Sequence, residues 1–273
     1  MTAADGWGWL ARIGILVIAK DPVPEAEIWA MAPAGVSVHS ARFDSPRKPG
    51  SDFTGDHAAA LAESPDIARG LDQLGQMPLD VICLCFGSSS FLAGAGFDER
   101  FCEQATARTH GVPVTTAPLA MLAAMRALRV SRPHLVIPPW FTPTSLAAAH
   151  RYLADSGFPL TGQTRFSLGE GWGERESFEA WDRDGQWEVR PEEVYRQARR
   201  GFDPHADCVL IPGSGFRSLA AIEPLERDLG VPVITSNQAC LWHCLRIAGA
   251  TGTGVGRLFD TPSDTNQPRT RTG

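Results

Sequence analysis

The sequence predicts an α/β fold of two pseudo-symmetric, Rossmann-like lobes, each a parallel sheet flanked by helices, with an active-site cleft between them. The main observation is an internal repeat: an apolar run that breaks into small residues occupies residues 80–88 and recurs 127 positions later at residues 207–215. A helix-like stretch and the sequence Gly-Val-Pro-Val follow each copy, at residues 111–114 and 230–233. Ligands of such folds bind at the carboxyl ends of the strands. The two small-residue turns should therefore face each other across one cleft.

Apolar runs alternate with helix-like segments through the first half of the chain. Residues 12–18 are a continuous apolar run, which is typical of a strand in a parallel sheet covered on both faces. Residues 45–55 are rich in proline, glycine and charge and should form a loop. Alanine, leucine and methionine make residues 118–128 a strong helix former. We also expect strands at 36–43, 81–86 and 112–115, and helices at 57–74 and 98–109.

The second half repeats this alternation. An apolar strand at residues 134–137 ends at two prolines, and another proline opens a helix at 143–156, where its missing N–H costs little. Two glutamates begin the helix at 191–200, which suits the helix dipole. Residues 169–186 are polar without a clear period and should be a surface excursion. We expect the remaining strands at 208–211 and 231–234, and the remaining helices at 218–229 and 238–247.

The division into lobes follows from this order of elements. Alternating strands and helices predict parallel sheets with right-handed crossovers, and 273 residues suffice for two small lobes. Residues 1–128 together with 231–260 should form the first lobe, and residues 129–230 the second. Residues 261–273 contain mainly Thr, Pro, Arg and Gly and should be a disordered tail.

Composition excludes several classes of partner. A net charge of −6 without clustered cations argues against nucleic acid, and no apolar run reaches the roughly 20 residues of a membrane helix. The sequence lacks a basic segment followed by an apolar signal core, so we expect a cytoplasmic protein with reduced cysteines. Cys83 and Cys85 have C-x-C spacing but no matching Cys/His cluster, so we expect no metal. The expected partner is a small-molecule substrate.

Several short motifs keep their order over residues 12–260. They lie at residues 12–15, 88–91, 112–116, 229–233, 236–239 and 256–259. With them the chain resembles the arylmalonate decarboxylase and maleate cis-trans isomerase branch of the aspartate/glutamate racemase superfamily. The resemblance implies proton transfer at a carbon next to a carboxylate, without a cofactor, and it makes a homo-oligomer plausible. Racemases and isomerases of this kind place one cysteine on each lobe, and the decarboxylases keep only the second-lobe cysteine.

This sequence departs from the family pattern at the decisive positions. The first-lobe Cys-Thr-Ser triplet aligns with a triplet that begins at Phe86, and the second-lobe cysteine aligns with Gly213, again 127 positions later. A carboxylate-binding tyrosine aligns with Trp140, and an asparagine with Asp21. We therefore interpret the chain as a divergent member that lacks both family cysteines. Cys85 precedes the triplet by one residue and should face the other side of its strand, unless a bulge rotates it into the cleft.

Five residues are candidates for chemistry in place of the thiols. Asp21 follows the first strand and could be a general base, and Lys20 an acid or Schiff-base amine. Alternatively, the two form an exposed loop pair. Ser88 and Ser214 lie on glycine-flanked turns that could bind an anion, although they could instead cap helices. His243 is the last candidate, and its alternative is a structural histidine.

The candidate substrate-binding residues surround the same turns. Phe86 and Trp140 are bulky where relatives carry small or polar groups, so they either fill space or line an apolar pocket for a ring-bearing substrate. Asn237 could donate to a carboxyl oxygen or cap the last helix. The full predicted set is Phe86, Gly87, Ser89, Ser90, Trp140, Gly213, Gly215 and Asn237.

Two classes of function follow from these residues. The first is a cofactor-independent lyase or isomerase, decarboxylase-like or maleate-isomerase-like, that acts on a small carboxylate- or carbonyl-bearing substrate by cysteine-independent proton transfer. A changed reaction on the same scaffold, such as dehydration, hydrolysis or ring rearrangement, is a variant of it. The second is a ligand-binding pseudoenzyme. Convergence of Asp21, the serines and His243 favours an enzyme, and a cleft plugged by Phe86 and Trp140 favours the pseudoenzyme.

Overall fold

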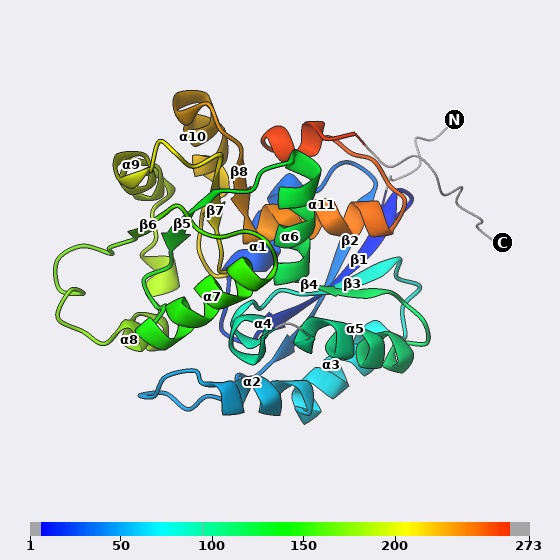
Figure 1. Ribbon diagram of the computed structural model, residues 1–273. Coiled ribbons are helices and arrows are strands. Elements are labelled where there is room, and N and C mark those ends of the chain that lie inside the picture. The colour runs from blue at the N-terminus through cyan, green and yellow to red at the C-terminus, as the bar shows by residue number, and fades with distance from the viewer. Residues whose placement is uncertain (1–6, 95, 263–273) are drawn as a thin grey trace.

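The computed structural model describes residues 7–94 and 96–262, which form two lobes around two parallel sheets (Figure 1). The strand order is β2-β1-β3-β4 in the first sheet and β6-β5-β7-β8 in the second. The two orders are the same pattern, so the duplication and the predicted fold class are confirmed. The strands are β1 (Ala11–Ile18), β2 (Val36–Phe43), β3 (Val81–Leu84), β4 (Val114–Thr116), β5 (Pro133–Ile137), β6 (Gly162–Arg165), β7 (Cys208–Ile211) and β8 (Val233–Thr235).

Helices cover both sheets and fill the space between the lobes. Figure 1 shows α6 and α11 crossing at the centre of the molecule, where they pack against each other. None of the described helices is long and apolar enough to span a membrane. The α-helices are α1 (Val23–Met31), α2 (Gly55–Ala62), α3 (Pro65–Leu74), α4 (Ser88–Ala93), α5 (Phe97–Arg108), α6 (Ala117–Leu128), α7 (Pro143–Asp155), α8 (Ser177–Asp182), α9 (Pro191–Gly201), α10 (Ile222–Leu229) and α11 (Ser236–Ile247). Short 3-10 turns are η1 (Gly185–Trp187), η2 (Leu219–Ala221) and η3 (Arg257–Asp260).

Two differences from the predicted elements have local causes. The helix expected at 57–74 is broken into α2 and α3, because Pro65 disfavours a helical conformation at Ser64 and opens a new helix. The hydroxyl of Ser64 accepts a hydrogen bond from the Asp66 N–H and caps α3. Strand β6 was not predicted. It is an edge strand of mixed polar residues that are half-buried or exposed, so it carries no apolar signal.

The lobe boundary at residues 231–260 needs a correction. This segment was predicted in the first lobe, but its strand β8 pairs with β7 of the second sheet, with Val209 opposite Val233. The reason is the internal repeat, since β4 pairs with β3 in the same way. Helix α11 then returns to pack on α6 and α1, so the segment links both lobes. The predicted tail at 261–273 lies, apart from residues 261–262, outside the described residues.

Candidate active site

A pocket lies between the lobes, at the carboxyl ends of β1, β3 and β7. Its cavity volume is about 70 Å³, which is enough for several waters or a small ligand. Residues of both small-residue turns line it, as the repeat predicted. Eight predicted site residues are among its lining: Asp21, Phe86, Gly87, Ser88, Trp140, Gly213, Ser214 and Gly215.

Asp21 is the buried titratable group of this pocket. The turn after β1 places it there: its N–H donates to the Ile18 carbonyl (2.9 Å), and its Oδ1 accepts from the Val23 N–H (3.1 Å). Its side chain is only 3% exposed. Burial raises the pKa of Asp21 from 3.8 to about 7, and the Val23 hydrogen bond and the nearby Arg42 offset this only in part. The group can therefore exist in either protonation state near neutral pH, as a proton-transfer residue requires.

The Asp21 carboxyl reaches across the cleft to the turn of the second lobe. A Cβ added to Gly215 would lie 2.9 Å from Asp21 Oδ2 and 2.8 Å from the Trp181 ring, so only glycine allows this close approach. Gly213 has a φ of +97°, and a Cβ there would lie 2.9 Å from Pro138. A side chain at position 213 would therefore be strained. This turn thus carries glycine at positions 213 and 215, and the Asp21 carboxyl lies beside it.

A buried hydrogen-bond network holds the second-lobe turn in place. Asn237, in the first turn of α11, donates from Nδ2 to the Ser214 carbonyl (2.9 Å) and to Glu27 Oε2 (2.8 Å). Glu27 Oε1 accepts from the N–H groups of Ser218 (2.7 Å) and Leu219 (2.8 Å). Asn237 therefore positions the turn and lies outside the pocket lining. Sequence reasoning did not identify Glu27 as a site residue, because its partners are 191 or more positions away.

The candidate serines separate into two groups. Ser88 and Ser214 line the pocket from opposite lobes, and the Ser214 hydroxyl is 3.1 Å from that of Ser236. Ser89 and Ser90 are fully buried and are not in the lining. The Ser90 hydroxyl instead donates to the buried Asp98 carboxylate at 2.7 Å. Asp98 also accepts from the hydroxyls of Thr116 (2.5 Å) and Tyr152 (2.8 Å), a set of contacts that ties α4 and α5 to α7.

Lys20 and His243 lie away from the Asp21 carboxyl. Lys20 is 39% exposed and pairs with Asp184 at 2.8 Å, outside the pocket. His243 faces a different groove, next to Arg246, and its ring lies 3.3 Å from the Thr115 hydroxyl. Burial lowers the pKa of His243 to about 4, with a smaller contribution from Arg246. The structure brings together Asp21, Ser88 and Ser214, and it does not bring His243 or Lys20 to them.

Aromatic side chains form the walls of the pocket. Phe86 makes an edge contact with Phe53 (5.3 Å between ring centroids), and Trp140 makes one with Trp181 (5.4 Å). These rings line the cavity without filling it, so its walls are mainly apolar. Phe91, Phe141 and Phe178 complete the aromatic lining.

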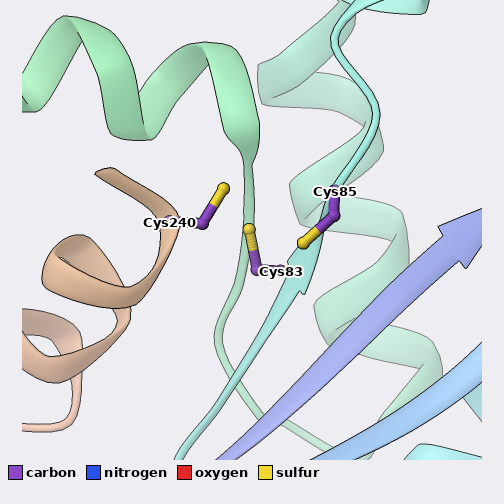
Figure 2. Close-up of side chains that lie close together, drawn as sticks. All are labelled: Cys83, Cys85 and Cys240. Carbon is purple, nitrogen blue, oxygen red and sulfur yellow. The ribbon is translucent and has the colours of Figure 1, made fainter. Parts of the chain in front are cut away.

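A third cysteine, distant in the sequence, lies beside the C-x-C pair. The C-x-C spacing alone did not predict this contact. Figure 2 shows Cys83 of β3 and Cys85, which directly follows β3, directed toward Cys240 of α11, and the three sulfur atoms lie within 4.8 Å of one another. Cys85 touches the pocket floor but is only 1% exposed. Hydrogen bonding with Cys240 and burial raise the pKa of Cys85 well above its ordinary value. A buried thiol that stays neutral, as that of Cys85 does, is a poor nucleophile.

Comparison with known proteins agrees with the fold. The family model of arylmalonate decarboxylase matches residues 61–259. Arylmalonate decarboxylase of Bordetella bronchiseptica is 31% identical over 207 residues, which covers 74% of this chain and 79% of that protein.

Solved structures share the two-lobed architecture. Unliganded arylmalonate decarboxylase superposes with a TM-score of 0.73 at 26% identity, covering 92% of this chain and 99% of that one. The maleate isomerase Iso of Pseudomonas putida S16 superposes with a TM-score of 0.76 at 19% identity, covering 93% of this chain and 99% of that one, and shows the shared fold. The relatives of this chain are thus enzymes, and the chain belongs to the arylmalonate decarboxylase family.

Proposed function

We propose that the protein is a cofactor-independent lyase that decarboxylates a small malonate-type acid carrying an aromatic or similar apolar ring. The observation that carries this proposal is the buried carboxyl of Asp21 against the Gly213–Gly215 turn, with a pKa raised to about 7. A group that is protonated near neutral pH can deliver the proton that this reaction needs. Isomerisation through the same carbanion is the related reaction that this site would also support.

The proposed step balances without a thiol. The bond between the α-carbon and one carboxyl carbon breaks, and CO₂ leaves. The electron pair stays on the α-carbon and delocalises into the remaining carboxylate as an enediolate. Protonated Asp21 then transfers its proton to the α-carbon, and its carboxylate recovers a proton from water.

Ser88 and Ser214 are the donors that we assign to the enediolate oxygens. They line the pocket from opposite lobes, so their hydroxyls can approach a small ligand from two sides. Donors fixed in a water-poor site stabilise developing negative charge more than water does. The network of Asn237 and Glu27 supports this role, because it fixes the main chain at Ser214.

A ligand-binding pseudoenzyme is the second candidate. It is favoured by the absence of an activated cysteine at either turn and by the aromatic walls around Phe86 and Trp140. In that case the pocket would bind a ring-bearing acid without turning it over. The two candidates differ in one observable, which is the release of CO₂.

The test is incubation of the purified protein in D₂O with phenylmalonate, methylphenylmalonate and maleate, followed by NMR and CO₂ detection. We expect CO₂ release from the arylmalonates and one deuterium on the α-carbon of the product. Saturable binding without CO₂ release or exchange would support the pseudoenzyme instead. Turnover of maleate alone would move the assignment to an isomerase.

Replacing Cys85 by alanine should leave this activity nearly intact. The Cys85 sulfur lies in the buried cluster with Cys83 and Cys240, and its raised pKa keeps it protonated. We expect kcat/KM within about threefold of the wild type, since no reacting group is lost. Cys102→Ala, at a half-buried thiol outside the pocket, is the matched control. A loss of about a hundredfold or more in Cys85→Ala alone, with the fold intact, would show that the thiol takes part.

A further inference from the structure

An ion pair joins the two lobes at the pocket. Arg47 lies in the loop between β2 and α2 of the first lobe, and Asp182 ends α8 of the second. The Arg47 guanidinium pairs with Asp182 Oδ1 through Nη2, and Nη1 lies 3.3 Å from Oδ2. Both side chains are largely buried, at 8% and 15% exposure. Asp182 Oδ2 also accepts from the Gly50 N–H at 2.8 Å.

Arg47 is the one cationic residue among the described residues that line the pocket. The other charged residues in the lining are Asp21 and Asp52, both acidic. A carboxylate that enters this pocket therefore has a single cation available to it. Burying an anion without a cationic or hydrogen-bonding partner is strongly unfavourable.

Arg47 still has donors to offer. Its Nη1 group donates to the Ser51 carbonyl at 2.6 Å, and one Nη2 hydrogen is directed to Asp182. Its Nε–H and the second Nη2 hydrogen make no hydrogen bond within residues 7–94 and 96–262. Guanidinium groups bind carboxylates through two parallel N–H donors. The side chain is thus held in place by one carboxylate and is equipped to bind another.

We propose that Arg47 binds the carboxylate that the substrate keeps through the reaction, through the Nε–H and Nη2–H donors that Asp182 leaves free. This inference rests on the proposed function. It adds that the substrate must be an acid that retains one negatively charged carboxylate after the reaction. In the free protein, Asp182 neutralises Arg47, so no uncompensated cation is buried. When the ligand is bound, Asp182 keeps its hydrogen bond from Gly50, and Lys20 lies next to it, donating to the Asp182 main-chain carbonyl at 3.2 Å.

This arrangement predicts opposite effects for the two halves of the pair, because Asp182 partly neutralises the cation that binds the ligand. Arg47→Gln removes the cation and should weaken binding of an acid about tenfold or more. Asp182→Asn removes the competing carboxylate and should strengthen binding of the same acid, by up to about tenfold. If the pair only closed the pocket mechanically, both variants would weaken binding of acids and neutral ligands alike. The sign of the Asp182→Asn effect therefore separates the two roles.

The experiment is calorimetric titration with 2-phenylpropanoate and its neutral isostere 2-phenylpropanamide, at about pH 6 so that Asp21 holds its proton. We expect the wild type to prefer the acid, Arg47→Gln to lose the preference, Arg47→Lys to regain part of it, and Asp182→Asn to increase it. Thermal unfolding confirms that each variant is folded. The inference is overturned if the wild type does not bind the acid, or if it binds the acid and the amide equally well. It is also overturned if Asp182→Asn binds the acid more weakly than the wild type does.

Binding and turnover are separate readouts here. If the arylmalonates are not decarboxylated but the preference for the acid still depends on Arg47, the proposed reaction fails and the assignment of Arg47 as the carboxylate-binding residue stands. If decarboxylation occurs without that dependence, the assignment of Arg47 fails and the reaction stands.

Discussion

Replacing Asp21 by asparagine is expected to lower kcat/KM for arylmalonate decarboxylation by about 10²–10⁴-fold, the usual contribution of a general acid. Asparagine keeps the shape of the side chain but has no proton of suitable pKa to donate. It also retains an oxygen for the Val23 N–H, so the turn after β1 should be preserved. The measurement is the steady-state rate of CO₂ release under saturating and limiting substrate.

His243→Gln is the matched control for this experiment. The structure places His243 in another groove, so its replacement should change kcat/KM by less than about threefold. If Asp21→Asn keeps wild-type activity while folded, Asp21 is not the proton donor. If His243→Gln lowers the rate as strongly as Asp21→Asn, the assignment of the proton-transfer site to this pocket is contradicted.

Asp21 should also destabilise the folded protein above neutral pH. Its pKa is about 7 in the folded state and 3.8 as the ordinary value, so the folded state holds this proton to higher pH than the unfolded chain does. The contribution of Asp21 to the free energy of unfolding is therefore fully present below about pH 4 and is lost as the pH rises to about 7. At about 1.4 kcal/mol for each pKa unit, the loss is roughly 4 kcal/mol.

Asp21→Asn lacks this titration, so its stability relative to the wild type should rise between about pH 4 and pH 7 and stay level above. Urea unfolding of both proteins at several pH values gives the difference directly. Comparing the two proteins matters, because Glu27 is also buried with a raised pKa and titrates in both of them. A difference that is constant over this pH range would mean that Asp21 is not desolvated as the structure shows.

Local patterns and the internal repeat predicted the fold. The apolar runs of the strands and the two Gly-Val-Pro-Val segments define β3 with β4 and β7 with β8 without any distant contact. Even the position of β8 in the second sheet is implied by that repeat, although the predicted lobe boundary assigned it to the first. Strand β6 could not be predicted, because an edge strand with exposed polar residues has no apolar alternation.

The sequence predicted only those pocket residues whose place follows from their position directly after a strand. Asp21, Ser88 and Ser214 follow strands, and strand ends meet at one edge of a parallel sheet. Glu27, Arg47 and Asp182 were missed, because each acts through a partner more than 130 positions away. Asn237 and His243 lie on the same helix, but six residues place them about 9 Å apart along its axis. Sequence similarity could not show that Asn237 reaches the turn at Ser214 whereas His243 does not.

The central claim is that a carboxylic acid, rather than a thiol, supplies the proton in this site. The most direct test is the pH dependence of kcat/KM for decarboxylation by the wild-type protein. Because the protonated form of Asp21 is the donor, the rate should be level at low pH and fall about tenfold per unit above an inflection near pH 7. A profile that rises through pH 7, or one that stays level to about pH 9, would contradict the assignment.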